Sequence, residues 1–192
     1  METVAPTKVE LRRQMRERLR QVADAGAWVV PRVLALPEVM AATWVAGFVS
    51  FGTEVPTHEL LRHLLAEGKH VCVPSFDPVG QRYICSELKH FDADLAPGKL
   101  DILEPRRAAL RPVAANKVDV WLVPGLAFDE HGNRLGRGMG YFDQLLRDAR
   151  GVKIGLAHDC QVVKKVPTDS HDVGMDWIVT ETRTIRCLRE RK

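Results

Sequence analysis

Short apolar runs rich in β-branched and aromatic residues alternate with helical patterns along most of the chain, and no other feature limits the fold as much. Apolar spacing predicts helices over 7–23, near 56–67 and near 141–150. The intervening runs predict strands over 44–50, 70–74, 82–88, 118–124, 152–158 and 176–181. Such alternation is typical of α/β proteins, in which helices cover a largely parallel sheet. We therefore expect one α/β domain of 192 residues.

Other segments are less regular. The apolar stretch 26–52 is expected to form a buried helix followed by a buried strand. It is not a membrane span, because it is interrupted well short of ~20 apolar residues by Pro31, Arg32, Pro37 and Glu38. The proline-rich and charged segment 91–116 is predicted to be a connector, with LDILEP (100–105) as its candidate for ordered structure. From about 183 onward we expect a solvated tail.

Composition excludes several classes of protein. A hydrophobic fraction of 45%, a charged fraction of 28% and a net charge of +3 are not those of collagen-like, disordered or disulfide-dense chains. So small an excess of cations gives no reason to expect nucleic acid or a membrane as a partner. The cysteines at 72, 85, 160 and 187 lack the spacing of a zinc site. With an N-terminus unlike a signal peptide, they favour a reduced, cytoplasmic compartment.

The first predicted helix has one apolar and one strongly basic face. Thr7 and Glu10 have the spacing of a capping box at its start. Its apolar positions recur at steps of four, four and three: Leu11, Met15, Leu19 and Val22. Its other face is rich in cations, namely Lys8, Arg12, Arg13, Arg16, Arg18 and Arg20. This excess predicts contact with an anion.

The segment 118–146 carries the chemistry. An apolar strand ends at Val123, and a polar, glycine-rich loop over 129–143 leads into a predicted helix. Arg134 and Arg137 supply charged donors, and Asp143 can hold Mg²⁺. Alternating glycines can turn backbone N–H groups toward one anion at the start of the helix; they are Gly136, Gly138 and Gly140. The loop therefore predicts a phosphate site.

Two common phosphate-binding motifs do not match this loop. It lacks the Gly-Lys-Ser/Thr end of a P-loop, and its third glycine falls one place too early for GxGxxG. On glycine spacing alone, a tight strand-to-helix connection with two solvated arginines remains an alternative.

The wider sequence VPGLAFDEHGNRLGRGMGYFD (123–143) resembles the signature of the 5-formyltetrahydrofolate cyclo-ligases, also called 5,10-methenyltetrahydrofolate synthetases. Their pattern runs approximately VPG-x-x-FD-x-x-G-x-RLG-x-G-x-GYYD. The rest of the chain is similar in order: the first helix, FVSFGTEVPT (48–57), HVCVP (70–74), GKLDILEP (98–105) and VPTDSHDVGMDWIVTE (166–181). The resemblance thus covers nearly the whole chain.

The resemblance implies a fold and an activity. The fold is a three-layer α/β/α arrangement with a mostly parallel sheet, like that of the CoA-transferase and ribose-phosphate isomerase group. The activity is an ATP-dependent ring closure that uses Mg²⁺. The formyl oxygen on N5 of 5-formyltetrahydrofolate is phosphorylated, and N10 then closes on the activated carbon to give 5,10-methenyltetrahydrofolate, ADP and phosphate. The expected protein is a monomer or weak homodimer.

The resemblance also implies a role for each matching residue. Arg137 and Tyr141 would act at the reacting centre, and Glu54 with Tyr141 would bind the folate. Asp143 and Asp172 would hold magnesium, with Asp176 as the alternative to Asp172. ATP would be bound by Lys8, Arg12, Arg134, Leu135, Gly136, Arg137, Gly138, Met139 and Gly140.

Departures from the family pattern leave alternatives open. Phe142 stands where the family commonly has tyrosine, and Met139 stands where glycine or lysine is frequent. The segment after HVCVP has no clear counterpart in the family, which leaves folate contacts from it open. Glu54 precedes a helix start, where an acidic residue is favourable without any ligand. One alternative is a diverged relative that uses ATP on another amide-like substrate. Another is an RNA-binding module that uses the basic first helix and the tail.

Overall fold

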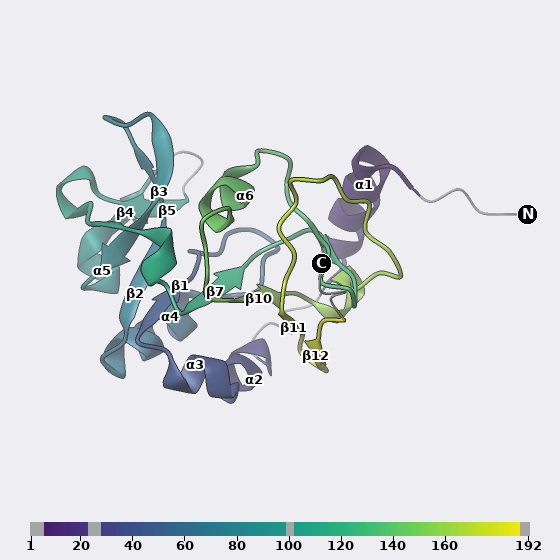
Figure 1. Cartoon of the computed structure of the whole chain (residues 1–192), viewed down its shortest axis with the longest axis horizontal. Helices are drawn as coiled ribbons and strands as arrows, with labels where there is room; N and C mark the ends of the chain where they lie inside the picture. Colours follow the sequence, from purple (N-terminus) through teal and green to yellow (C-terminus); the bar gives the residue numbers. More distant parts are fainter. Residues whose placement is uncertain (1–5, 23–27, 99–101, 189–192) are drawn as a thin grey trace, which may run out of the picture.

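One mixed eight-stranded sheet forms the centre of the computed structural model, which describes residues 6–22, 28–98 and 102–188 (Figure 1). The strand order is β12-β11-β10-β7-β1-β2-β3-β6. The five neighbouring strands from β11 to β2 are parallel and span Trp177–Val179, Val152–Leu156, Val120–Val123, Trp44–Ala46 and His70–Asp77. The antiparallel strands β12, β3 and β6 span Thr184–Arg186, Arg82–Leu88 and Pro112–Val113. The predicted mostly parallel sheet is confirmed.

Alternation along the strands gives the sheet two apolar faces. Val45 and Leu122 pack in the larger core, whereas Ala46, Trp121 and Val123 pack in a second core on the opposite face. The larger core also contains the apolar side chains of three helices, α2, α3 and α4, which span Val29–Leu34, Pro37–Ala41 and His58–Ala66. The second core contains those of α6 (Tyr141–Leu146). Helices therefore cover both faces of the sheet.

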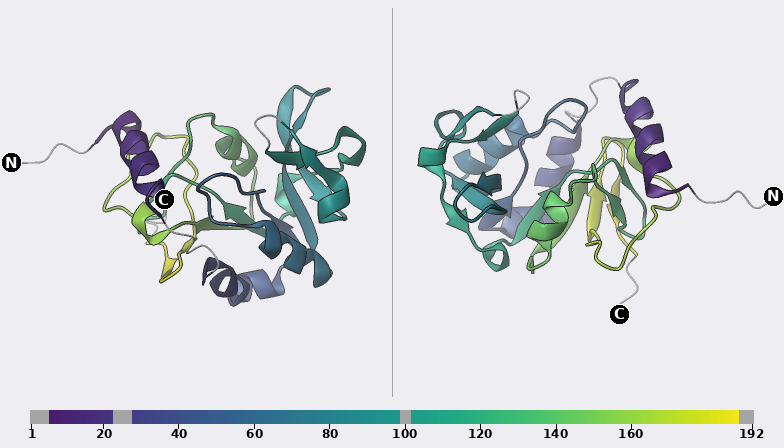
Figure 2. Two further views of the ribbon diagram at one scale, coloured as in Figure 1. Left: turned by 180° about the vertical axis from the view of Figure 1, so that it is seen from behind. Right: turned by 90° about the horizontal axis from the view of Figure 1, so that it is seen from above.

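Helix α1 (Lys8–Leu19) lies at the side of the sheet near β10–β12, as Figure 2 shows. Leu11, Met15 and Leu19 are buried there in a third cluster. The cluster includes residues of the small hairpin formed by β8 (Ala127–Phe128) and β9 (Arg134–Leu135). α1 also contacts a 3₁₀ turn over Asp159–Gln161.

The predicted capping box of α1 is confirmed. The Thr7 hydroxyl accepts a hydrogen bond from the Glu10 N–H, and the Glu10 carboxylate accepts one from the Thr7 N–H. Helix α1 ends at Leu19, short of the predicted 23; position 23 itself lies outside the described residues.

The connector predicted over 91–116 is wrong in part, because short elements occupy it. They are α5 (Phe91–Asp94), β4 (Leu95–Pro97), β5 (Leu103–Pro105), two 3₁₀ turns over Arg107–Ala109 and Ala115–Lys117, and β6. Strands β4 and β5 form an antiparallel ribbon. Within LDILEP, order is found in β5, and 100–101 lie outside the described residues. These elements depend on tertiary pairing, which short local patterns do not reveal.

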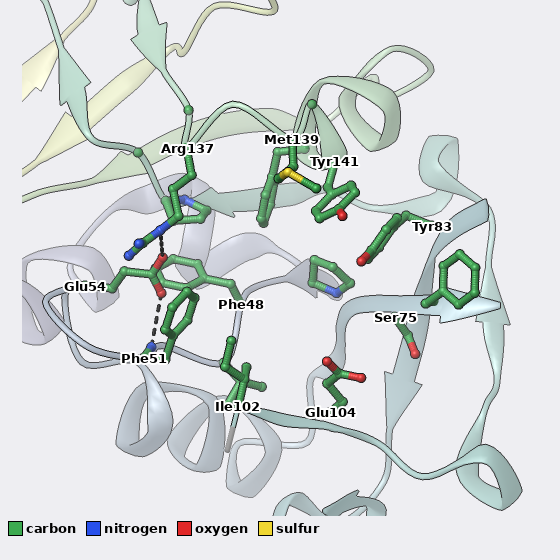
Figure 3. Close-up of a pocket in the computed structure, with 18 of the residues that line it drawn as sticks. Phe48, Phe51, Glu54, Ser75, Tyr83, Ile102, Glu104, Arg137, Met139 and Tyr141 are labelled. Carbon is green, nitrogen blue, oxygen red and sulfur yellow. Dashed lines mark hydrogen bonds and ion pairs between the residues drawn. The ribbon is translucent and has the colours of Figure 1, made fainter. Parts of the chain in front are cut away.

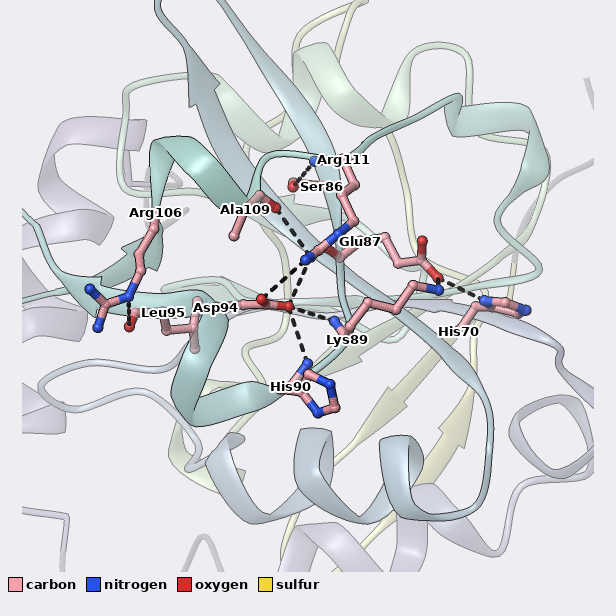
Figure 4. A network of polar contacts seen from close by, with 10 residues as sticks. All are labelled: His70, Ser86, Glu87, Lys89, His90, Asp94, Leu95, Arg106, Ala109 and Arg111. Atoms are coloured by element: carbon pink, nitrogen blue, oxygen red, sulfur yellow. Dashed lines mark hydrogen bonds and ion pairs between the residues drawn. The ribbon is translucent and has the colours of Figure 1, made fainter.

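A buried carboxylate joins this region to the main sheet (Figure 4). Asp94, at the end of α5, accepts hydrogen bonds from the Arg111 guanidinium and from the N–H groups of Lys89 and His90. Burial opposes ionisation, but these hydrogen bonds prevail and lower the pKa of Asp94 to about 2. Arg111 also donates to the Glu87 carbonyl of β3. The network therefore fixes α5 and the β4–β5 ribbon against β3.

Several predicted boundaries were also wrong. Strand β1 ends at Ala46 rather than at 50, because the chain there leaves the sheet and forms a loop. The helix expected after 26 is two short helices, since Pro37 starts α3; positions 26 and 27 lie outside the described residues. The segment predicted as a tail contains β12, whose backbone pairs with β11, while 189–192 lie outside the described residues. Helix α6 ends at Leu146 rather than at 150, and turns follow it.

The described helices include none with the length and apolar run needed to cross a bilayer. All four cysteines are free thiols.

Candidate active site

A cavity of about 410 Å³ opens beside the carboxyl ends of β1 and β7 (Figure 3). Its lining comes from five parts of the chain: the loop after β1, the β2–β3 hairpin, β5 with Ile102 before it, the turn after β7, and the glycine-rich loop with the start of α6. Most of this lining is apolar or aromatic, including Phe48, Phe51, Phe76, Tyr83, Ile102, Met139 and Tyr141. A cavity of this size and character suits a small organic ligand with flat rings.

The glycine-rich loop forms one wall of this cavity. Gly138 has φ +110° and Gly140 has φ +68°, conformations that favour glycine. Met139, between these two glycines, is 65% exposed, and its φ is not positive. Gly140 is the N-cap of α6, whose first residue is Tyr141. The expected glycine-dependent turn from strand to helix is therefore present.

A second, smaller hollow of about 140 Å³ lies on the other side of this loop. It brings together α1, the loop and the segment before β11, with a lining of Lys8, Arg12, Arg134, Leu135, Gly136, Gly138, Gly140, Asp143, Asp169, His171 and Asp172. The Arg12 Nε donates to the Gly136 carbonyl at 3.0 Å, which holds α1 against the loop. Most of the predicted ATP and metal residues therefore meet at one place.

Lys8 lies between two carboxylates at this hollow. Its Nζ is 2.7 Å from Asp169 Oδ2 and 2.6 Å from Asp172 Oδ2. Burial opposes the charge, but the two carboxylates prevail and raise the pKa of Lys8. The contact with Lys8 likewise lowers the pKa of Asp172 against the effect of burial. The ammonium group is thus held as a cation facing the glycine-rich loop.

Asp169, His171 and Asp172 can present ligand atoms within 4.8 Å of one another. Asp176 does not join them, because its carboxylate accepts a hydrogen bond from the Lys153 N–H inside the sheet. Of the two aspartates left open by the sequence, the structure places Asp172 at the hollow. Carboxylate oxygens there match the preference of Mg²⁺ for hard oxygen ligands.

Arg134 is the most buried cation of the site, with its side chain 4% exposed. Its guanidinium donates to Asp143 and, at 3.3 Å, to the Pro124 carbonyl. Leu135 contributes no side chain to the hollow, because that side chain is buried in the third core cluster. Both residues therefore shape the loop from within the protein.

Arg137 and Glu54 connect the two sides of the cavity. The Arg137 Nε donates to Glu54 Oε1 at 3.0 Å, and its guanidinium lies 4.5 Å from the Phe51 ring centre. Glu54 also accepts a hydrogen bond from the Phe51 N–H at 3.1 Å. Burial raises the pKa of Glu54, although Arg137 and the Phe51 N–H counteract it.

The loop that carries Glu54 is fixed by its own hydrogen bonds. The Ser50 N–H donates to the Thr57 hydroxyl at 3.0 Å, and the Thr57 N–H donates to the Ser50 hydroxyl at 2.9 Å. The Thr57 hydroxyl in turn donates to the Phe48 carbonyl. These contacts place the chain between β1 and α4 over the cavity.

Residues 4–181 match the model of the 5-formyltetrahydrofolate cyclo-ligase family. The chain belongs to this family. It is 33% identical over 176 residues to the 5-formyltetrahydrofolate cyclo-ligase of Escherichia coli strain K12, covering 89% of this chain and 97% of that protein. It is 29% identical to the corresponding protein of Haemophilus influenzae, covering 85% and 94%.

Solved structures agree with the cyclo-ligase membership. The NMR structure of Aquifex aeolicus 5,10-methenyltetrahydrofolate synthetase matches with a TM-score of 0.82 and 30% identity, covering 96% of this chain and 95% of that one. The synthetase of Mycoplasma pneumoniae matches with a TM-score of 0.72, covering 92% and 99%; at 19% identity it supports the fold alone.

Sequence reasoning missed one aromatic pair of this cyclo-ligase cavity. Tyr83 on β3 stacks on Tyr141, with ring centres 3.8 Å apart. Burial and the hydrogen bond with Tyr141 raise the pKa of Tyr83 to about 12, so its phenol is protonated at neutral pH. Phe76, opposite Tyr83 in the hairpin, packs edge-on against it. Tyr83 lies in a predicted strand and Tyr141 at the start of a predicted helix, so the sequence contained both elements but no local pattern that indicated their contact.

Proposed function

We propose that this chain catalyses the ATP-dependent cyclisation of 5-formyltetrahydrofolate to 5,10-methenyltetrahydrofolate, with release of ADP and phosphate. The observation that carries the proposal is the glycine-rich loop, which lies between a polar hollow lined by both cations and carboxylates and a mainly apolar cavity. The names of full-length relatives, 5-formyltetrahydrofolate cyclo-ligase and 5,10-methenyltetrahydrofolate synthetase, support the same reaction.

The phosphate groups of ATP are assigned to the side of the loop that α1 faces. Lys8 and Arg12 supply positive charge from α1, and Arg134 lines the same hollow. Arg137 lines the larger cavity rather than this hollow, and supplies charge to the terminal phosphate from that side of the loop. Backbone N–H groups over 134–140 complete this site, to which Leu135 contributes only its main chain. Because Lys8 and Arg12 face a small hollow, the placement favours a nucleotide over RNA as their anionic ligand.

The folate is assigned to the apolar cavity. Its pterin ring packs among the aromatic side chains, with Tyr141 beside the reacting centre. The Glu54 carboxylate accepts hydrogen bonds from ring N–H groups once a ligand replaces part of its contact with Arg137. Placing the two substrates on either side of one loop brings the formyl oxygen toward the terminal phosphoryl group.

The proposed chemistry needs no covalent enzyme intermediate. The formyl oxygen attacks the γ-phosphorus of ATP, a new P–O bond forms, and ADP leaves. N10 then attacks the formyl carbon, the C–O bond breaks with release of phosphate, and the N10 proton is lost to solvent. Phosphoryl transfer of this kind depends mainly on positioning and on neutralisation of charge, which the cations and N–H groups of the loop supply.

Magnesium is assigned to Asp143 and Asp172. Both carboxylates line the hollow, and their oxygens suit this ion. When bound, Mg²⁺ would neutralise charge on the phosphate oxygens. Lys8 pairs with Asp172 and Arg134 pairs with Asp143, and these contacts hold the two carboxylates in place. We further assign the enzyme to the cytoplasm, in keeping with its four free thiols. We also propose that it is a monomer or weak homodimer.

The test is a direct assay. Purified protein, Mg-ATP and 5-formyltetrahydrofolate are mixed, and methenyltetrahydrofolate is followed by its near-ultraviolet absorbance together with phosphate release. We expect equal amounts of the two products. Absence of the folate product with folded protein would contradict the proposal. If a panel of other amide-like substrates then gave phosphate release, the diverged relative would be the correct interpretation.

A further inference from the structure

A carboxylate without an assigned role points into the cavity from β5. Glu104 lines the cavity with Ser75 and Tyr83, and Figure 3 shows its carboxylate on the side of these two residues. Glu54 lies elsewhere in the same view, beside Phe51 and Arg137. Glu54 and Glu104 therefore approach the cavity from different elements.

The charges along the cavity wall do not balance. Its lining contains three carboxylates, Glu54, Glu104 and Asp143, and two guanidinium groups, Arg134 and Arg137. Arg137 pairs with Glu54, and Arg134 pairs with Asp143. No ion pair joins Glu104 to a cation within the described residues. A carboxylate in this position is available to N–H donors of a ligand.

The β4–β5 ribbon holds Glu104 in position. Ala96 and Glu104 are directly opposite each other in its register, and the Gly98 N–H donates to the Ile102 carbonyl at 2.8 Å. A Cβ atom at position 98 would lie only 2.7 Å from Glu104 Cδ, so the carboxyl group packs on the space that glycine leaves. The Asp94 network fixes the start of the ribbon against β3. Glu104 is thus an exposed residue whose carboxyl group lies against the Gly98 backbone of the ribbon.

The shape of a reduced pterin decides which of its donors reaches Glu104. N5, which carries the formyl group, belongs to one ring, whereas the 2-amino group and N3–H lie on the other ring. The proposed function, on which this inference rests, places N5 at the glycine-rich loop, beside Tyr141 and toward Arg137. The amino edge then faces away from this loop, toward the opposite part of the cavity, where Glu104 lies.

We propose that Glu104 is a specificity-determining residue that accepts hydrogen bonds from the 2-amino group and N3–H of the pterin ring. Two adjacent N–H donors match the two oxygens of one carboxylate. Glu54, whose oxygens already accept from Arg137 and the Phe51 N–H, serves donors nearer the reacting end. Glu104 binds substrate without taking part in phosphoryl transfer, so its loss affects folate binding and leaves ATP binding intact.

Binding measured by calorimetry without ATP tests the assignment. Wild type, Glu104→Ala and Glu104→Gln are titrated with 5-formyltetrahydrofolate, and separately with a non-hydrolysable ATP analogue. We expect folate affinity to fall about ten- to hundredfold in Glu104→Ala and less in Glu104→Gln, which keeps one acceptor oxygen. Affinity for the ATP analogue stays unchanged. Glu67→Ala, at an exposed position after α4, is the matched control and binds both ligands as wild type does.

A second ligand separates recognition from support of the fold. In this analogue of 5-formyltetrahydrofolate a methyl group replaces the 2-amino group. We expect Glu104→Ala and wild type to differ by less than about threefold toward it, because the main donor is gone. An equal loss for both ligands, or unchanged folate affinity in Glu104→Ala, would overturn the inference. If wild type itself binds no 5-formyltetrahydrofolate, the proposed function fails, and this outcome is distinct because it precedes any mutation.

Discussion

Arg137 donates a hydrogen bond from Nε to Glu54 Oε1 at 3.0 Å, and so joins the glycine-rich loop to the loop between β1 and α4. The two residues are 83 positions apart in the chain. Arg137 is assigned to phosphate and Glu54 to the folate, so the residue proposed to bind one substrate contacts the residue proposed to bind the other. The pair therefore joins the proposed ATP site to the proposed folate site.

Replacing Arg137 with alanine is expected to lower turnover by about a hundredfold, because a charged donor to the transferred phosphoryl group is lost. Its side chain is 39% exposed, so the free energy of unfolding should change by about 1 kcal/mol or less. Methenyltetrahydrofolate formation and thermal unfolding measure the two effects. Arg13→Ala, an exposed cation on α1, serves as control. Unchanged turnover would exclude a phosphate role for Arg137.

ATP and folate are expected to strengthen each other's binding. Either ligand must disrupt the Arg137–Glu54 pair, and the second ligand then finds it already open, which gives positive coupling of about fivefold or more. Calorimetry with 5-formyltetrahydrofolate, with and without a non-hydrolysable ATP analogue, measures this coupling. In Arg137→Ala the factor by which the ATP analogue raises folate affinity should fall close to one. A variant that kept the full wild-type factor would contradict the explanation.

Folate binding is expected to weaken as the pH falls. Burial raises the pKa of Glu54 above its ordinary value of 4.5, so this carboxylate takes up a proton in mild acid and loses acceptor capacity. The same pKa shift acts in the opposite direction on the free energy of unfolding. Between 4.5 and the raised pKa, Glu54 is protonated more often in the folded chain than in the unfolded chain. Lowering the pH through this range therefore stabilises the fold through this group. Calorimetry from pH 7.5 to 5 tests the binding effect. Glu54→Gln should bind folate more weakly with little dependence on pH, and an equally steep decline in that variant would assign the effect to another group.

Much of the sheet could be predicted because its central strands are apolar runs, which indicate a strand from the local sequence alone. Val45, Trp121 and Leu122 lie in apolar runs bounded by turn residues, and such runs predict buried parallel strands without knowledge of their neighbours. The cap of α1 was equally local, since Thr7 and Glu10 are three residues apart. The strands β6 and β12 could not be predicted, because each is short and is defined by the partner strand with which it pairs.

The candidate site followed the same division. The glycine-rich loop is a continuous motif, so its turn at Gly138 and Gly140 could be predicted from spacing. The contacts of Tyr83 with Tyr141 and of Lys8 with Asp172 join distant parts of the chain, and no local pattern states which side chains will meet. The resemblance indicated Lys8 and Asp172 separately; only the structure gives their ion pair. The roles of these residues in binding remain predictions.

Asp94 is expected to support both stability and folate binding. Although burial opposes it, the hydrogen bonds from Arg111 and from two backbone N–H groups lower the pKa of Asp94 from 3.8 to about 2. A depressed pKa stabilises the fold above 3.8, and this contribution is lost as the pH falls toward 2. Asp94→Asn keeps the size of the side chain but removes its charge, and should cost about 2 kcal/mol at pH 7.

Urea unfolding at pH 7 and at pH 3 measures this cost, which should be smaller at pH 3 because the wild-type advantage declines there. Asp92→Asn is the matched control, since Asp92 lies on the same helix but is 78% exposed and pairs with Arg62 at the surface. Because Asp94 anchors the ribbon that carries Glu104, its replacement should also weaken binding of 5-formyltetrahydrofolate while leaving that of an ATP analogue unchanged. Equal losses for the two ligands would mean that the network supports the whole fold rather than this wall of the cavity.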